Sequence, residues 1–145
     1  MLNRKARYEY HILETMEAGI MLLGPEVKSL RAGLGNLTES HCIVRNGQVE
    51  LVGCYINPYR PAATNNHPDP ARTRRLLLHK QQITRLIGKL KEKGVTLIPL
   101  KLYFNERGIA KLEIALGRGK KMHDKRQAIK ERDIRRDLQR NYKTG

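Results

Sequence analysis

The stretch "TLIPLKLYFNERGIAKLEIAL" (residues 96–116) contains two runs in which apolar and polar side chains alternate, separated by a short polar turn. Alternation with a period of two is typical of strands that bury one face. The "NERG" segment between them suits a hairpin loop, because Gly108 can adopt the left-handed conformation. Pro99 has no amide hydrogen, so we expect an edge strand or a bulge there. The stretch predicts an antiparallel hairpin.

A second hairpin is predicted at "HCIVRNGQVELVG" (residues 41–53), where Asn-Gly separates two alternating runs. A type I′ turn needs positive φ at both central positions, which Asn and Gly tolerate. In that register Cys42 faces Leu51, and Cys54 lies roughly 10 Å farther along. This spacing disfavours a disulfide within the hairpin. We expect buried free thiols, with a disulfide or half of a metal site as the alternatives.

Upstream, alternation at Tyr8, Tyr10 and Ile12 predicts a first strand, and "EAG" (17–19) is expected to end it before a second strand at "IMLLG" (20–24).

Pro25 then fits the first position of a helix that buries Val27, Leu30 and Leu34 and stops at Gly33 or Gly35. Two basic residues, Lys28 and Arg31, lie off that buried stripe.

Residues 57–72 contain four of the six prolines and predict a long loop of the functional or disordered kind. After it, Ile83, Leu86, Ile87 and Leu90 predict a helix that stops at Gly94. The preceding Leu76, Leu77 and Leu78 are expected in helical structure, where three consecutive residues cannot share one face. One of them is therefore expected to be exposed, and burial of all three at a helix junction is the alternative.

This order of elements lacks the strand–helix alternation of a parallel sheet. It favours a mainly β fold, a small antiparallel barrel of the oligonucleotide-binding type with flanking helices. Residues 1–117 are expected to form that domain. Residues 118–145 are expected to be a basic C-terminal tail, disordered when free.

The charge of the chain points to a polyanionic partner, because 29 Lys and Arg face 14 Asp and Glu. Eleven of the basic residues and four of the acidic ones fall in residues 118–145. No window has the roughly 20 apolar residues of a membrane span. Without an apolar signal-peptide core near Met1, we expect a cytoplasmic nucleic-acid-binding protein.

Catalysis has no support in the sequence. "GRGK" (117–120) lacks the upstream glycine and the following Ser or Thr of a phosphate-binding loop. We find no nucleophile elbow, metalloprotease motif or carboxylate pair beside a pocket. We expect neither enzymatic activity nor a metal or other cofactor.

In the tail, Ile134, Leu138 and Tyr142 recur every four residues among the basic side chains. This narrow stripe cannot hold a free helix on the core, but bound to a polyanion the segment could fold and present its cations to phosphates. A solvated tail without a specific role is the alternative.

Four blocks of the chain together resemble one family closely, SmpB, the protein partner of transfer-messenger RNA (tmRNA, or SsrA RNA) in ribosome rescue. They are "NRKARYEYHI" (3–12), "EAGIMLLGPEVKSLRAG" (17–33), "DPARTRRLLLHK" (69–80) and "GKKMHDKR" (119–126). The resemblance implies an oligonucleotide-binding-type barrel. It also implies an adaptor of trans-translation that binds the tRNA-like domain of tmRNA. The adaptor helps to deliver that RNA, with elongation factor Tu bound to it, to the small subunit of a stalled ribosome.

The resemblance also assigns residues. Arg4, Arg72 and Arg74 suit phosphates or guanine edges, and an exposed Leu77 suits an unstacked base. We expect Glu17 to accept hydrogen bonds from base amino groups or a 2′-hydroxyl, with a turn carboxylate paired to arginine as the alternative. The expected RNA-binding set is Asn3, Arg4, Glu17, Lys28, Arg31, Arg72, Arg74 and Leu77.

For the tail, the resemblance implies a position at the decoding centre, continuing as a helix in the empty mRNA channel. His123 is expected to stack on a ribosomal base, with a solvated residue as the alternative. The expected ribosome-contacting residues are Gly119, Lys120, Lys121, His123, Lys125 and Arg126. The rival classes are a structural ribosomal protein, which would share the charge but not the four blocks, and an RNA-processing enzyme.

Overall fold

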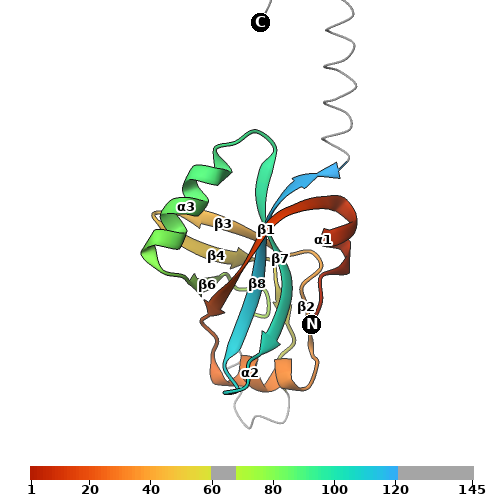
Figure 1. The fold of residues 1–145 in the computed structure, drawn as a ribbon. Coiled ribbons are helices and arrows are strands. Elements are labelled where there is room, and N and C mark those ends of the chain that lie inside the picture. Colours follow the sequence, from red (N-terminus) through yellow and green to blue (C-terminus); the bar gives the residue numbers. More distant parts are fainter. Residues whose placement is uncertain (60–67, 121–145) are drawn as a thin grey trace, which may run out of the picture.

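The computed structural model describes residues 1–59 and 68–120. Within them lie three helices and eight strands (Figure 1). In chain order these are α1 (Arg4–Glu9), β1 (Tyr10–Ile20), α2 (Gly24–Arg31), β2 (Gly35–Asn36), β3 (His41–Arg45), β4 (Gln48–Val52), β5 (Tyr55–Ile56), β6 (Arg74–Leu77), α3 (Lys80–Leu90), β7 (Val95–Phe104) and β8 (Ala110–Gly119).

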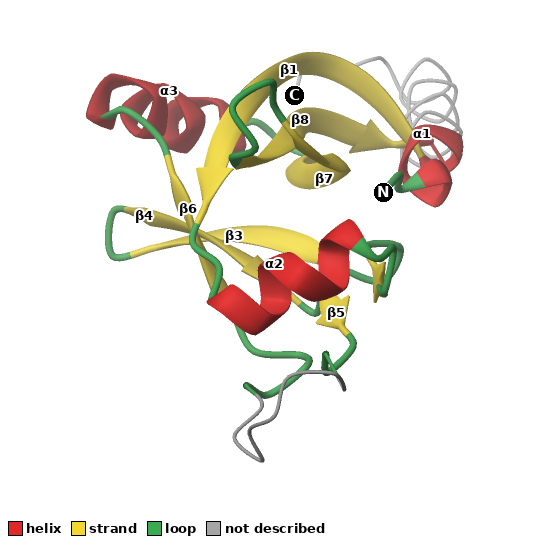
Figure 2. Ribbon diagram, turned by 90° about the horizontal axis from the view of Figure 1, so that it is seen from below, coloured by secondary structure: helices red, strands yellow, loops and turns green. Residues whose placement is uncertain are grey.

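Six antiparallel strands form one sheet in the order β3-β4-β6-β1-β8-β7, and β2 pairs with β5 in a small second sheet. The two edge strands, β3 and β7, approach each other, so the sheet curls into a barrel. The view from below shows β1, β8 and β7 on one side, β3, β4 and β6 on the other, and α2 across the end (Figure 2). The predicted mainly β barrel with flanking helices is confirmed.

Both predicted hairpins are confirmed. Asn46 and Gly47 have φ values of 52° and 70°, and Cys42 lies opposite Leu51. Gly108 turns the β7–β8 hairpin at φ 74°. Pro99 lies on an edge strand, and the register of that strand shifts between Pro99 and Lys101.

The thiols of Cys42 and Cys54 are free and buried, as predicted. Burial raises the pKa of both, that of Cys54 to about 11, so they remain protonated at neutral pH. They act as small apolar side chains in the core.

The beginning of the chain differs from the prediction. Residues 4–9 form a helix, because Asn3 caps it by accepting a hydrogen bond from the amide of Ala6 at 3.2 Å. The first strand therefore starts at Tyr10 and continues through "EAG" to Ile20 without a break. The separate strand predicted at residues 20–24 was wrong: pairing with β8 through Gly19 overrides the local break.

The leucine run also differs, because it belongs mainly to a strand. Leu76 in β6 is buried at 2 % exposure, and Leu77 points outward at 50 %. The expectation that one leucine is exposed was right, but strand alternation is the cause. The helix predicted at residues 83–90 is confirmed as α3, with Leu86 fully buried and Gly94 at φ 82°.

The helix predicted after Pro25 is confirmed as α2, but its buried residues are polar. Glu26 and Ser29 are buried, whereas Val27 and Leu30 are only half-buried and Leu34 is exposed. The reason is that a buried cluster of charges, described below, lies under this helix.

Two groups of side chains make up the core. The larger fills the barrel and includes Leu37, Leu51, Leu86, Leu112 and Ile114. The smaller lies under α1 and consists of Ala6, Ile98, Leu100 and Ala115. Ala115 alternates with Leu116 along β8, yet both are buried, because α1 covers the face of the sheet to which Ala115 points.

Candidate nucleic-acid interface

One exposed face of the barrel collects residues from four adjacent strands. Glu17 of β1 lies opposite Glu113 of β8, and Gly19 lies between Lys111 on one side and Leu77 on the other. Their chain neighbours Ala18, Leu76 and Leu112 point into the core. We call this surface the outer sheet face; it consists of Glu17, Gly19, Leu77, Lys101, Tyr103, Lys111 and Glu113.

Glu17 has two partners on the outer sheet face among the described residues. The hydroxyl of Tyr103 donates a hydrogen bond to its Oε2, and Lys111 Nζ lies 4.0 Å from Oε1. Neither is an arginine, and Glu17 lies within a strand, so the alternative of an arginine-paired turn carboxylate was wrong. Burial and the bond to Glu17 raise the pKa of Tyr103 from its ordinary value of 10.0 to about 12, so the phenol is protonated at neutral pH with a wide margin and donates to the carboxylate.

Leu77 lies beside Gly19 and extends the outer sheet face toward β6. A Cβ on Gly19 would lie 3.1 Å from the Cβ of Leu77, a tight contact. The glycine therefore leaves room for Leu77 at this crossing of β1 and β6. The result is an exposed apolar side chain within two residues of the Glu17 carboxylate along the sheet.

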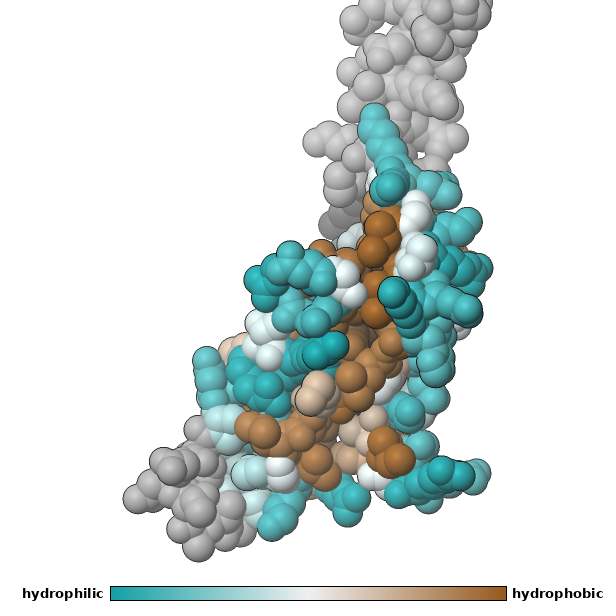
Figure 3. Space-filling model, turned by 90° about the vertical axis from the view of Figure 1, so that its left-hand side faces the viewer, coloured by the Kyte–Doolittle hydropathy of each residue, from teal (hydrophilic) through white to brown (hydrophobic). Residues whose placement is uncertain are grey.

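Apolar surface is not confined to Leu77. The side of the molecule on which α3 lies in Figure 1 has a band of apolar residues flanked by hydrophilic ones (Figure 3). The large apolar side chains that are exposed among the described residues include Leu13, Met21, Leu23, Leu77 and Ile87. Such side chains suit contacts with unstacked bases or sugars.

Asn3 is placed differently from the prediction. Its side chain is only 3 % exposed; Oδ1 caps α1, and Nδ2 donates to the carbonyl of Pro99 at 2.9 Å. The backbone of Asn3 also pairs with β7, through Leu100. Its position therefore gives Asn3 a structural role, that of fixing α1 on the sheet. Arg4, the next residue, is exposed and free to meet solvent or a ligand.

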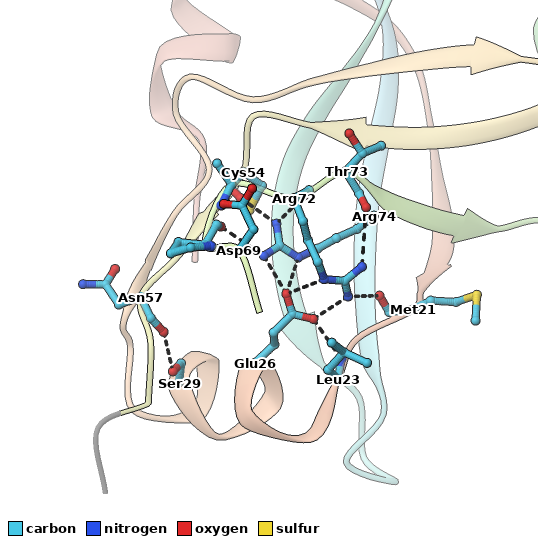
Figure 4. Close-up of polar contacts among 12 residues, drawn as sticks. Met21, Leu23, Glu26, Ser29, Cys54, Asn57, Asp69, Arg72, Thr73 and Arg74 are labelled. Carbon is cyan, nitrogen blue, oxygen red and sulfur yellow. Dashed lines mark hydrogen bonds and ion pairs between the residues drawn. The ribbon is translucent and has the colours of Figure 1, made fainter. Parts of the chain in front are cut away.

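Beneath α2, Glu26 binds two arginines at once (Figure 4). Arg72 Nη2 lies 2.5 Å from Oε1, and Arg74 Nε donates to Oε2 at 2.8 Å. The Leu23 amide donates to Oε1 as well, at 2.8 Å. Burial alone would raise the pKa of the Glu26 carboxyl, but the hydrogen bonds from Arg72, Leu23 and Arg74 outweigh it and lower the pKa.

Arg74 is fully buried, which contradicts its expected position on the RNA-facing surface. Its remaining donors go to the carbonyls of Cys54 at 2.6 Å, Arg72 at 3.0 Å and Pro70 at 3.1 Å. Arg72 keeps 28 % of its side chain exposed. Arg74 therefore joins α2 to the segments around residues 54 and 70, while Arg72 still reaches the surface.

Lys28 and Arg31 are exposed on α2, at the end of the barrel. The Lys28 Nζ lies 5.9 Å from the ring centroid of Tyr59. The Arg31 guanidinium lies 5.3 Å from that of Phe104 and donates to the carbonyl of Gly108 at 3.3 Å. Both side chains are exposed, and Arg31 lies beside the β7–β8 turn.

The predicted tail falls mostly outside the described residues, which end at Lys120. Gly119 closes β8 opposite Tyr10, two residues beyond the expected end of the barrel domain. Arg118, just before it, lies 3.5 Å from Glu92. The predictions for Lys121, His123, Lys125 and Arg126 lie outside the described residues.

Sequence reasoning missed Glu26, Tyr103 and Lys111. The hairpin register alone places Tyr103 opposite Lys111. That Tyr103 reaches Glu17 depends on the long-range pairing of β1 with β8, for which the sequence carries no local signal. Within residues 1–59 and 68–120 no group of three potential metal ligands is found, and no helix is both long and apolar enough to cross a membrane.

Comparison with known proteins identifies the family. The family model described as SmpB protein matches residues 1–144. The chain belongs to the SmpB family. It is 56 % identical over 138 residues to the SsrA-binding protein of Desulforamulus reducens, covering 95 % of this chain and 85 % of that relative. It is 57 % identical over 137 residues to the SsrA-binding protein of Chlorobaculum tepidum, with coverages of 94 % and 87 %.

An SmpB structure shares the fold as well. The solved structure described as "tmRNA-SmpB: a journey to the center of the bacterial ribosome" matches with a TM-score of 0.69 and 53 % sequence identity. The match covers 83 % of this chain and 83 % of that one. At this identity and coverage the two chains share the same fold.

Proposed function

We propose that this protein is a non-enzymatic adaptor of trans-translation, which binds the tRNA-like domain of tmRNA and promotes its delivery to stalled ribosomes. The observation that carries the proposal is that Glu17 and Leu77 share one exposed face in a chain of the SmpB family. Elongation factor Tu takes part through the RNA, and the chain itself binds RNA and the small ribosomal subunit.

The outer sheet face recognises the folded RNA. Leu77 supplies an apolar contact for a base or a sugar, and Glu17 accepts hydrogen bonds from amino groups or a 2′-hydroxyl. A carboxylate is repelled by phosphates, so it favours a partner that presents donors at that point over generic RNA. Arg4, Arg72, Lys28 and Arg31 are exposed at least in part and add contacts with phosphates.

Residues 118–145 bind the stalled ribosome, which is the second part of the proposed function. Their eleven basic side chains suit a channel lined with RNA, and Gly119 to Arg126 meet the decoding centre. The empty mRNA channel then accepts the segment that follows, whereas a channel filled with mRNA excludes it.

Truncation tests this division of labour. Ending the chain at Lys120 keeps the β8 pairs of Arg118 and Gly119 with β1. We expect the truncated protein to bind the tRNA-like RNA nearly as tightly as the full chain, because the outer sheet face is intact, and to lose tagging of peptides on stalled ribosomes. A large loss of binding would instead place the RNA grip in the tail, and unchanged tagging would refute the role of the tail.

A further inference from the structure

We propose that Tyr103 is a positioning residue for RNA recognition, because its hydroxyl fixes the Glu17 carboxylate across the width of strand β8. The inference rests on the proposed function, since it assigns Tyr103 a part in the contact that Glu17 makes with RNA. Tyr103 would thus contribute to RNA binding indirectly, by orienting Glu17.

The geometry of the sheet makes this contact specific. Tyr103 is on β7 and Glu17 is on β1, and β8 lies between them. Two strand spacings amount to roughly 10 Å, so only a long side chain on one of the strands can close the gap. Tyr103 crosses β8 beside Lys111, and its hydroxyl donates to Glu17 Oε2.

The contact leaves one oxygen of Glu17 available. Oε1 has Lys111 at 4.0 Å, which is beyond hydrogen-bond distance, and about half of the Glu17 side chain is exposed. The neighbouring carboxylate differs, because the Glu113 side chain is only 33 % exposed, against 52 % for Glu17, and Arg7 Nη2 lies 3.5 Å from its Oε1. Of these two acids on the outer sheet face, Glu17 is therefore the one that offers a fixed acceptor to a ligand.

Tyr103 is itself held in place. Lys101, on the same strand, places its ammonium 5.2 Å from the centroid of the tyrosine ring. The ring is half-buried, and its phenol remains protonated at neutral pH. A flexible glutamate with several rotamers thus has one orientation before RNA arrives, and this removes part of the ordering cost of binding.

The test measures selectivity, the ratio of the Kd for random RNA to the Kd for tRNA-like RNA, with the full-length protein. Tyr103→Phe removes only the hydroxyl; we expect it to lower the ratio roughly two- to tenfold, the range of one hydrogen bond. Because Tyr103 acts through Glu17, the same substitution in the Glu17→Ala protein should lower the ratio no further. Tyr55→Phe is the matched control, since Tyr55 is 44 % exposed on the small β2–β5 sheet, and it should leave the ratio unchanged.

Three outcomes would overturn the inference in distinguishable ways. If Glu17→Ala lowers the ratio but Tyr103→Phe does not, Tyr103 has no positioning role and the proposed function stands. If Tyr103→Phe lowers the ratio equally with and without Glu17, the hydroxyl acts on its own. If Glu17→Ala leaves the ratio unchanged, the proposed role of Glu17 fails, and that of Tyr103 fails with it.

Discussion

Neutralising Glu26 is expected to destabilise the protein more than neutralising an acid whose basic partner is exposed. Glu26→Gln keeps the size of the side chain and one carbonyl acceptor, but it leaves the charge of Arg74 without a counter-ion. Arg74 is fully buried, so solvent cannot replace the lost partner. Breaking a buried ion pair by removing one member costs about 3–5 kcal/mol. For a domain of this size such a loss corresponds to a fall in Tm of roughly 10–25 °C.

Urea unfolding followed by circular dichroism measures this difference. The matched control is Glu14→Gln, because Glu14 keeps 28 % of its side chain exposed, against 2 % for Glu26, and its partner Arg85 is 60 % exposed. An exposed pair contributes about 1 kcal/mol or less, so the control should unfold almost as the unmodified protein does. The reasoning would be refuted if Glu26→Gln and Glu14→Gln unfolded at the same urea concentration.

Four further outcomes are expected. The pKa of the Glu26 carboxyl is lowered in the folded state, so its ionised form contributes fully to the free energy of unfolding above the ordinary pKa of 4.5. This contribution is lost as the pH falls through the lowered pKa. The free energies of unfolding at about pH 6 and about pH 3 should therefore differ less in Glu26→Gln than in the unmodified protein. Gly117→Ala should cost about 1–3 kcal/mol in urea unfolding, because its Cβ would lie 2.7 Å from Ile98 Cδ1 and 3.1 Å from the backbone oxygen of His11, whereas Gly88→Ala, with open space around it in α3, should cost nothing and can add up to about 1 kcal/mol. Leu77→Ala should change the unfolding free energy by less than about 1 kcal/mol yet weaken binding of tRNA-like RNA in a filter assay; normal binding would remove Leu77 from the interface. If six phosphates are neutralised, log K should fall by roughly five per decade of salt, and a flat titration would contradict an electrostatic contribution.

The sequence predicts well those elements whose shape is fixed by the backbone preferences of residues within the element itself. The turn at Asn46 and Gly47 fixes its hairpin, because few other dipeptides tolerate positive φ twice. The Pro99 bulge and the end of α3 at Gly94 follow from the backbone chemistry of single residues in the same way.

The elements that were missed depend on partners distant in sequence. The "EAG" segment breaks the local pattern, yet it stays in β1 because β8 and β6 pair with it on both sides. The leucine run has no helix to join, since β4 and β1 flank Leu76 in the sheet. Tertiary pairing overrides local preference in both cases.

The candidate site likewise contains residues whose positions could be predicted from local sequence and residues whose positions depend on distant partners. Exposure of Glu17 and Leu77 could be expected from strand or turn positions, but the burial of Arg74 could not. An arginine in a basic, RNA-binding sequence looks like a phosphate contact until its acidic partner is known. That partner, Glu26, is 48 residues away and on another element. Residue type alone therefore cannot separate the arginines that bind RNA from those that build the fold.

Strand β8 fixes the distance between the outer sheet face and the start of the basic tail. Glu113 lies on the outer sheet face, and Gly119 closes the same strand six residues later, at a separation of roughly 20 Å. Because β1 pairs with β8 from Lys111 to Gly119, with one register shift between Ile12 and Glu14, the sheet fixes the separation of Glu113 and Gly119. The point where the basic tail begins is thereby held at a set distance from the outer sheet face. Two residues added to both strands would lengthen that distance by about 7 Å without reversing which side chains point outward.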